Sequence, residues 1–224
     1  MLRMNAVCKN YTLRSRVVNA LDDVSLDIPE GDWVSVVGPS GSGKSTLLLT
    51  LGGMLTPSSG RVMLDDESLY DLTPDQRARL RRGKIGFLFQ TFNLVPYLTA
   101  AENVQIPLYL AGLSDSLQAS QAATLLERVG LGDRIDHKPA ELSVGQQQRV
   151  ALARVLANDP SVILADEPTG NLDPETTRQV MGIIGEINAE GRTIVMVTHS
   201  PQYAGLAKRT LRLDAGRMYP DGEM

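Results

Sequence analysis

A glycine-rich segment at residues 38–46 constrains the fold of this chain more than any other part of the sequence. It reads Gly-Pro-Ser-Gly-Ser-Gly-Lys-Ser-Thr and matches the pattern GxxxxGK[ST] at every fixed position. An apolar, β-branched run precedes it at 33–37, and a run suited to a helix follows at 47–51. Strand, glycine loop and helix in this order are typical of a phosphate-binding loop, because backbone N–H groups and the positive end of the helix meet one anion. We therefore expect an α/β fold that holds a polyphosphate here.

The residue types within the loop predict individual roles. Gly41 and Gly43 allow the backbone to turn, so that successive N–H groups point inward. Lys44 is expected to reach the β- and γ-phosphates of a nucleotide, and the Ser45 hydroxyl to complete the shell of a Mg²⁺ ion. The nucleotide-binding residues expected from this loop are Gly38, Pro39, Ser40, Gly41, Ser42, Gly43, Lys44, Ser45 and Thr46.

An acidic pair follows a second apolar run. Residues 161–165 predict a buried strand that ends at Asp166 and Glu167. Ligands of parallel sheets bind at the carboxyl ends of the strands, so this pair is expected beside the loop. Asp166 would hold Mg²⁺ through water, and Glu167 would polarise the attacking water. Two solvated carboxylates at a strand end are the alternative, which the presence of the loop disfavours.

Three further side chains have two interpretations each. Gln90 ends the strand expected at 84–89 and either contacts a metal or a water, or is a solvated strand end. His199 follows the strand expected at 192–197 and either hydrogen-bonds a γ-phosphate and the nearby carboxylate, or is structural. Tyr11 either stacks on an adenine ring or is a half-buried strand tyrosine, and its spacing does not decide between these.

The rest of the pattern indicates two smaller units around this site. Residues 1–30 alternate apolar and polar positions in short runs, which predicts antiparallel strands. A helical pattern extends from Thr99 to about Gly130, and we expect Pro107 and Gly112 to break it. Thr73 followed by a proline predicts the start of another helix, whose arginines (Arg77, Arg79, Arg81 and Arg82) are expected to form a solvated face.

Composition excludes several classes of function. A net charge of −4 with dispersed Lys and Arg argues against a nucleic-acid-binding surface. Cys8 is the single cysteine, so no internal disulfide is expected. We expect a reduced compartment for the protein and a small, buried thiol at Cys8. No apolar run approaches the ~18 residues that span a bilayer, and early polar residues argue against a secretory signal.

Residues 142–149, Leu-Ser-Val-Gly-Gln-Gln-Gln-Arg, resemble the signature motif that separates ABC-type ATPases from other P-loop proteins. The resemblance covers nearly the whole chain. Its motifs, in order, are the aromatic Tyr11, the Walker A loop at 38–46, Gln90 of the Q-loop, the signature Ser143 to Gly145, the Walker B pair Asp166 and Glu167, the D-loop Asn171 to Asp173 and the switch His199.

The resemblance implies a single domain over 1–224 with an α/β, P-loop NTPase fold. This fold has a mostly parallel central sheet with helices on both faces, an N-terminal antiparallel β subdomain and an inserted α-helical subdomain. The core would comprise 1–90 and 160–224, and the helical subdomain about 91–159. Ser143 is a good N-cap, and Gly145 would leave N–H groups free for a phosphate.

The resemblance also implies a reaction and a partner copy. The cofactors would be ATP and Mg²⁺, and two copies would sandwich two ATP molecules as a homodimer. The expected catalytic residues are Glu167, His199, Lys44 and Gln90; the expected metal site is Ser45, Gln90 and Asp166; and Ser143, Gly145 and Gln146 would bind the nucleotide of the other copy. Val144 replaces the first glycine of the usual LSGGQ, and Ser200 stands where the family commonly has Asp, but neither removes a catalytic group.

Within the family, the segments 86–104 and 165–173 resemble the branch of lipoprotein-releasing, macrolide-efflux and cell-division ATPases. That branch implies a separate permease with few membrane spans and a peripheral location on the cytoplasmic face of the inner (plasma) membrane. The apolar residues of 92–103 either form the groove for a permease helix or pack in the core. A subunit of a small polar solute importer and a nucleotide-gated dimerisation module that signals to a partner are the alternatives.

Overall fold

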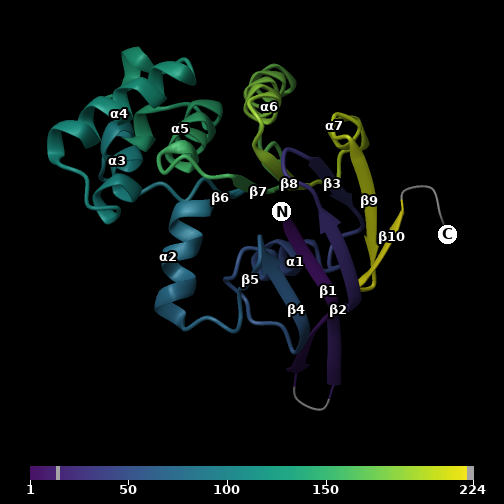
Figure 1. Cartoon of the computed structure of the whole chain (residues 1–224). Coiled ribbons are helices and arrows are strands. Elements are labelled where there is room, and N and C mark those ends of the chain that lie inside the picture. The colour runs from purple at the N-terminus through teal and green to yellow at the C-terminus, as the bar shows by residue number, and fades with distance from the viewer. Residues whose placement is uncertain (14–15, 221–224) are drawn as a thin grey trace.

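A parallel sheet organises the molecule, whose computed structural model describes residues 1–13 and 16–220 (Figure 1). The sheet has six strands in the order β10-β9-β3-β8-β7-β6, and β10 alone runs antiparallel to its neighbour. Its strands are β3 (Trp33–Val37), β6 (Ile85–Leu88), β7 (Val162–Asp166), β8 (Thr193–Val197), β9 (Arg209–Asp214) and β10 (Arg217–Pro220). The strands predicted at 33–37, 84–89, 161–165 and 192–197 are all present.

The parallel strands are apolar throughout because both faces of the sheet are covered. In β7, Val162 and Leu164 face one hydrophobic core, while Ile163 and Ala165 face another. Helix α1 (Lys44–Leu51) and the second sheet cover the first face, and helices α5 (Val144–Leu156) and α6 (Pro174–Ala189) cover the other. Burial on two faces explains why β-branched residues dominate these runs.

The second sheet is antiparallel and has four strands in the order β2-β1-β4-β5. Figure 1 shows it below the central sheet, with β1 and β2 as a long ribbon. It bears out the antiparallel strands expected in residues 1–30. Its strands are β1 (Leu2–Leu13), β2 (Arg16–Ile28), β4 (Ser59–Leu64) and β5 (Glu67–Ser68).

A helical unit stands on the opposite side of the molecule from this second sheet (Figure 1). It comprises α3 (Ala100–Leu110), α4 (Asp115–Arg128), α5 and two short 3₁₀ turns, Gly132–Arg134 and Pro139–Glu141, around a core of its own. Thr99 starts α3 with a capping box, in which its hydroxyl accepts from the backbone N–H of Glu102 and the Glu102 carboxylate accepts from the backbone N–H of Thr99. The expected break at Pro107 is wrong: α3 continues to Leu110, because the proline removes only its own N–H from the helix and the helix ends three residues later.

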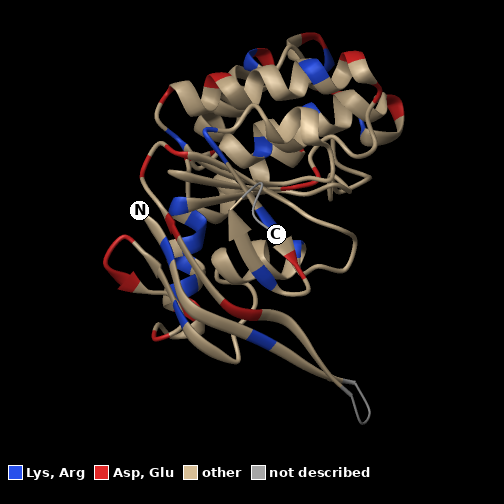
Figure 2. Ribbon diagram, turned by 90° about the vertical axis from the view of Figure 1, so that its right-hand side faces the viewer, with Lys and Arg blue, Asp and Glu red and all other residues tan. Residues whose placement is uncertain are grey.

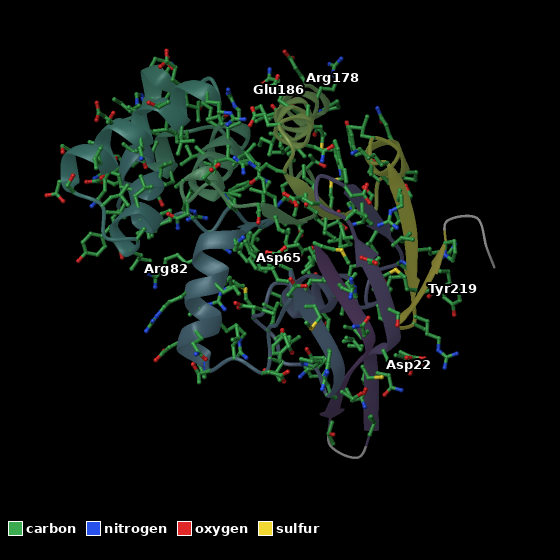
Figure 3. All side chains as sticks on the ribbon, viewed as in Figure 1. Asp22, Asp65, Arg82, Arg178, Glu186 and Tyr219 are labelled. Atoms are coloured by element: carbon green, nitrogen blue, oxygen red, sulfur yellow. The ribbon has the colours of Figure 1, made fainter. Side chains whose placement is uncertain are left out.

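Helix α2 (Pro74–Lys84) joins the two units and corrects another expectation. Its arginines do not form a merely solvated face. The Arg77 guanidinium lies 5.0 Å from the centroid of the Tyr70 ring, and Arg82 donates a 2.6 Å hydrogen bond to the carbonyl of Leu110 (Figure 3). Carbonyls in the last turn of a helix lack internal partners, so a guanidinium from α2 satisfies one at the end of α3.

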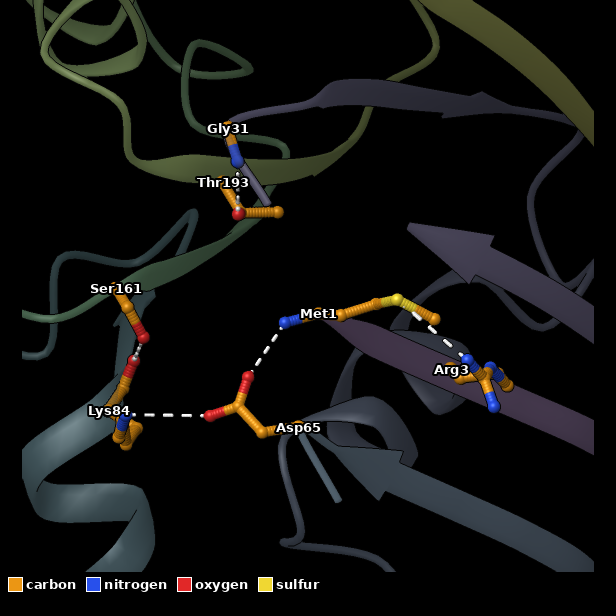
Figure 4. Close-up of polar contacts among 7 residues, drawn as sticks. All are labelled: Met1, Arg3, Gly31, Asp65, Lys84, Ser161 and Thr193. Atoms are coloured by element: carbon orange, nitrogen blue, oxygen red, sulfur yellow. Dashed lines mark hydrogen bonds and ion pairs between the residues drawn. The ribbon is translucent and has the colours of Figure 1, made fainter. Parts of the chain in front are cut away.

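Polar contacts at the C-terminal end of α2 tie the antiparallel sheet to the central one (Figure 4). Asp65 accepts from the amino group of Met1 at 2.7 Å and pairs with Lys84 at 3.4 Å. The hydrogen bond from that amino group holds the pKa of Asp65 below its ordinary value. Ser161, just before β7, donates to the Lys84 carbonyl at 3.3 Å. The chain segments before β6 and β7 therefore have a fixed relative position.

Two smaller findings complete the fold. Cys8 is only half-buried, and its sulfur accepts from the backbone N–H of Asp23 at 3.3 Å, so the buried thiol expected from the sequence is partly wrong. In the described part of the chain, no helix combines the length and the apolar character that crossing a bilayer requires.

Candidate nucleotide-binding site

A pocket of about 520 Å³ lies where the loop at 38–46 meets the carboxyl ends of β6, β7 and β8. It brings together ten residues predicted from the sequence and one that was not predicted, Ala20 of β2. The lining residues are Ala20, Ser40, Gly41, Gly43, Lys44, Ser45, Thr46, Gln90, Asp166, Glu167 and His199. Ala20 carries no chemical signal in the sequence; it lines the pocket because the second sheet folds back against the loop.

Glycine is required at the end of the loop. Gly43 has a φ of 108°, and a Cβ there would lie 2.1 Å from the carbonyl oxygen of Ala20. Gly41 has a φ of 79°, which also favours glycine. Helix α1 begins directly after, at Lys44, so its first free N–H groups face the pocket.

The cation and the hydroxyl of the loop are already held in place. The Lys44 ammonium donates to the carbonyl oxygens of Gly38 at 2.8 Å and Pro39 at 3.1 Å, which fixes it over the loop. Ser42 is buried, and its hydroxyl has no hydrogen-bond partner in the described residues. A loop with inward N–H groups, an ammonium and an unpaired hydroxyl fits a polyphosphate.

Asp166 and Ser45 form an oxygen-donor pair suited to Mg²⁺. Burial raises the pKa of Asp166 above its ordinary value and the Glu167 charge adds to this, whereas a hydrogen bond from Ser45 and the Lys44 charge lower it. Magnesium sites commonly use one or two carboxylates and complete the octahedron with water and phosphate oxygens. Within the described residues no group of three or more acidic, His or Cys side chains is arranged to hold a metal ion by itself.

Glu167 and His199 form a hydrogen-bonded pair at the pocket. The distance from Glu167 Oε2 to His199 Nδ1 is 2.9 Å, and the same oxygen accepts from the backbone N–H of His199 at 3.2 Å. An ionised carboxylate only accepts, so Nδ1 carries the hydrogen and a neutral ring leaves Nε2 as an acceptor. The imidazole is largely exposed, which leaves it accessible to a ligand.

Gln90 lies beside the segment that follows Glu167. The Asn171 amide donates to the backbone carbonyl of Gln90 at 3.3 Å, and a Cβ on Gly170 would lie 2.9 Å from Gln90 Nε2. The Q-loop glutamine and the D-loop are thus packed against each other.

Tyr11, in contrast, is 37% exposed on β1, lies under the Lys9 ammonium at 5.3 Å and does not line the pocket.

The signature residues also lie outside this pocket, at the start of α5. Ser143 Oγ accepts from the Gln146 N–H at 3.2 Å, and Gln146 Oε1 accepts from the Ser143 N–H at 2.9 Å, so the two side chains cap the helix reciprocally. Gly145 packs against α6: a Cβ there would lie 2.1 Å from Thr176 Cγ2. Val144 is exposed beside them.

Taken together, the loop, the acidic pair and the strand-end histidine define a P-loop ATPase. A family model described as ABC transporter matches residues 21–170. The chain belongs to the ABC transporter family and is an ATP-binding, ATP-hydrolysing cassette of it. The expected fold class is confirmed by the same finding.

Relatives agree with this assignment over almost the whole chain. It is 46% identical over 224 residues to the macrolide export ATP-binding/permease protein MacB of Syntrophobacter fumaroxidans, covering 99% of this chain and 31% of that protein. It is 46% identical over 212 residues to an uncharacterized ABC transporter ATP-binding protein of Thermotoga maritima, covering 95% and 91%. The chain thus spans about a third of the length of the MacB relatives that it matches.

Solved structures agree as well. The ATP-binding cassette MJ0796, solved as a dimer in a post-hydrolysis state with ADP and Pi, has a TM-score of 0.92 and 41% identity, with all of both chains covered. A second dimeric structure of that bacterial ABC transporter cassette has a TM-score of 0.92 and 42% identity, again with both chains covered completely. The expected resemblance to the macrolide-efflux branch is confirmed by the MacB relatives.

Proposed function

We propose that two copies of this chain close over two ATP molecules and that the closure and its reversal drive a separate membrane permease of the efflux, lipoprotein-releasing or force-transmitting type. The observation that carries the proposal is the Glu167–His199 hydrogen bond of 2.9 Å, which faces Lys44 and Asp166 across one pocket. A base, a cation and a metal ligand within the same pocket are the groups that phosphoryl transfer to water needs.

The roles of individual residues follow from their contacts. Lys44 would exchange the carbonyls of Gly38 and Pro39 for β- and γ-phosphate oxygens, a short movement of one flexible ammonium. Glu167 would accept a hydrogen bond from the attacking water, while His199 keeps that carboxylate oriented. Gln90 would hold the same water or the metal.

Mg²⁺ would be held by Ser45 and Asp166, with Gln90 beside them, and would neutralise charge that develops on the β- and γ-phosphate oxygens. The raised pKa of Asp166 is consistent with this role, because a buried carboxylate without a full counter-charge favours a cation next to it. Water exclusion and the positioning of the nucleophile would come from the protein alone.

The second copy would supply the signature residues. Ser143, Gly145 and Gln146 lie outside the chain's own pocket, so one chain alone offers no signature contact to its nucleotide. Dimeric solved relatives support a homodimer in which each signature helix N-terminus faces the other copy's phosphates. Gly145 would be needed twice, for packing on Thr176 and for close approach by the other copy.

The permease would dock in a cleft of about 480 Å³ between α2, β6, α3 and α5. Apolar side chains from several elements line it, among them Met54, Phe89, Ile106 and Leu110, with Arg82 at the same surface. The sequence left two interpretations open for the apolar residues of 92–103, a permease groove or core packing; Phe92 and Leu94 pack against the core between the sheet and α6. A peripheral position on the cytoplasmic face of the membrane would follow from this docking.

Replacing Glu167 by Gln tests the proposed chemistry. The amide keeps the size of the side chain and loses the basic oxygen, so turnover should fall by about 100-fold or more while ATP binding persists. Size-exclusion chromatography with light scattering should then detect an ATP-dependent dimer that the wild-type chain forms only transiently. Glu186→Gln, on the outer face of α6, is the matched control (Figure 3). Near-native hydrolysis by Glu167→Gln would contradict the assigned role.

A further inference from the structure

A second, smaller hollow adjoins the nucleotide pocket. It measures about 330 Å³ and is lined by Val37, Gly38, Pro39, His199 and Arg212. His199 lines both cavities and is the one residue that their linings share. Its imidazole therefore stands between the site of phosphate cleavage and this hollow.

The sheet register places an arginine in that hollow. Strand β9 pairs in parallel with β3, and Arg212 is opposite Val37, the residue that directly precedes the loop. Arg212 is therefore anchored on a strand of the central sheet, beside the first residues of the loop. A cation fixed on a strand is held more precisely than one on a flexible loop.

The hydrogen bonding of Arg212 is incomplete. Its Nε is buried and has no partner in the described residues. Its Nη2 reaches the Asp214 carboxylate only at 3.5 Å, the outer limit of a hydrogen bond. A guanidinium has five N–H donors and no acceptor, and a buried donor without an acceptor is destabilising. Because the Nε is inaccessible, the Nη groups of this 36% exposed side chain are the donors that a ligand in the hollow would meet, and their one carboxylate contact in the described residues is long.

An oxyanion suits these donors. Guanidinium groups bind phosphate oxygens through pairs of N–H donors in a fixed fork. His199 has one ring nitrogen occupied by Glu167 and presents the other edge of the ring. Gly38, Pro39 and Val37 add only backbone and small apolar groups, and among the described residues Asp214 is the carboxylate that pairs with the guanidinium.

We propose that this hollow is an oxyanion subsite that receives the inorganic phosphate produced by hydrolysis, with Arg212 as its cationic ligand. The proposal rests on the proposed ATP hydrolysis. In that reaction water attacks the γ-phosphorus and gives its proton toward Glu167, the bond to the bridging oxygen breaks with its electron pair left on ADP, and the orthophosphate formed carries the oxygen of the water. It then leaves the pocket past His199 and pairs with the guanidinium, while ADP stays on the loop.

Equilibrium dialysis of radiolabelled orthophosphate against the full chain with saturating ADP and Mg²⁺ tests this. Arg212→Gln should raise the dissociation constant for phosphate about tenfold, since it removes a charge-assisted pair. Arg212→Lys keeps the charge but lacks the paired N–H donors, so its dissociation constant for phosphate should lie between those of Arg212→Gln and wild type. Arg217→Gln, on neighbouring β10 and paired with Asp22, is the control that should bind phosphate like wild type. ADP affinity should be equal in all four proteins.

Three results would overturn the proposal. Phosphate affinity in Arg212→Gln equal to wild type would remove Arg212 as the ligand. Exclusion of phosphate by ATP bound to Glu167→Gln would place the anion at the γ-phosphate position instead of a separate hollow. Weaker ATP-dependent dimerisation by Arg212→Gln, with phosphate binding unchanged, would assign the guanidinium to a contact between copies. A wild-type chain that does not bind or does not hydrolyse ATP would instead contradict the proposed function, independently of these results.

Discussion

The position of the Glu167 carboxylate depends on the backbone conformation of that residue. Its φ of 46° lies in the left-handed region, which costs about 1–2 kcal/mol for a residue with a side chain. Its N–H donates to the Val197 carbonyl at 3.0 Å, and its carboxylate pairs with His199. The strained backbone joins the ends of β7 and β8 and points the carboxylate at the pocket. A Glu167→Gln variant keeps this backbone bond, so it tests the charge alone.

The contribution of Tyr70 to folding stability should decrease at alkaline pH. Its O–H lies 2.7 Å from the Thr50 carbonyl oxygen and 2.6 Å from that of Leu55, so one hydrogen is shared between two acceptors. Burial raises the pKa of Tyr70 to about 12, although the Arg77 charge opposes this. The folded-state pKa thus exceeds the value of about 10 for an unfolded chain. The contribution to stability is complete below pH ~10 and is lost as the pH rises through ~12.

Tyr70→Phe tests this sign. At pH 8 the variant should lose about 1 kcal/mol of unfolding free energy, the usual value of a neutral hydrogen bond. Between pH ~10 and ~12 the advantage of wild type over Tyr70→Phe should shrink, because only wild type gains a titrating phenol on unfolding. Urea denaturation at pH 8, 10 and 11 measures the difference, with the exposed Tyr109→Phe as control. A constant difference across this range would contradict the assignment.

Helix α5 is the element that connects the motifs. Near its start Gly145 packs on Thr176 of α6. In its middle Gln148 donates a 2.6 Å hydrogen bond to the Pro168 carbonyl, directly after Glu167. Toward its end Arg154 donates 2.6 Å hydrogen bonds to the carbonyls of Phe92 and Asn93, which lie two and three residues after Gln90. The signature helix is therefore hydrogen-bonded to both the segment after Gln90 and the segment after the acidic pair.

We expect Arg154 to act as a positioning residue for Gln90, because it binds the segment that follows Gln90. Phe92 and Asn93 have φ values of 51° and 52°, a conformation that costs energy and persists only when neighbours fix it. Burial lowers the pKa of Arg154, and its fork holds both carbonyls. Arg154→Gln should lower kcat about tenfold by loosening the Q-loop, and leave KM for ATP within about twofold, because the loop at 38–46 is untouched.

Steady-state ATPase kinetics of Arg154→Gln and Arg154→Lys measure this separation of kcat from KM. The Lys variant cannot form the fork and should recover little activity. Arg178→Gln, whose side chain points away from the sheet in Figure 3, is the matched control and should behave as wild type. Equal losses in kcat and in ATP affinity would indicate general loosening of the fold rather than positioning.

Sequence patterns predicted the elements better than the contacts between them. The helix starts at Thr73 and Ser143 could be predicted because capping boxes need only residues three positions apart. The family resemblance implied a nucleotide role for Gln146 in the other copy; within one chain its side chain caps α5 through the N–H of Ser143. The contact of Arg82 with the end of α3 depends on residues 28 positions apart, which no local pattern contains.

Over the whole molecule, charged residues of both signs are dispersed, whereas the cleft proposed for docking lies at one place, between the helical unit and the core. Figure 2 shows Lys and Arg interspersed with Asp and Glu along the ribbon, in accord with the net charge of −4. A mixed surface does not favour a polyanion such as nucleic acid. The cleft at Phe89, Ile106 and Leu110 joins the helical unit to the core and adjoins the Arg154 contacts, so a partner seated there would contact the linkage that orients α5.

The Leu110→Asp variant tests whether the membrane partner docks in this cleft. Leu110 is 54% exposed at the end of α3, and a carboxylate there replaces an apolar contact surface of the cleft with a charge that can pair with the neighbouring Arg82. Recovery of a membrane partner with the tagged chain, extracted in mild detergent and quantified by mass spectrometry, should fall at least tenfold. ATP hydrolysis by the isolated chain should stay within about twofold, since the cleft shares no residue with the nucleotide pocket.

Leu117→Asp supplies the control, because Leu117 is 53% exposed on α4 and lies outside the cleft. Undiminished recovery with Leu110→Asp would place the partner elsewhere. The identity of the recovered protein separates the remaining functions: a permease with few spans and a large external domain supports efflux or force transmission, and a solute permease supports import. A homodimer recovered without any membrane protein would favour a nucleotide-gated module, because closure over ATP would then itself be the signal.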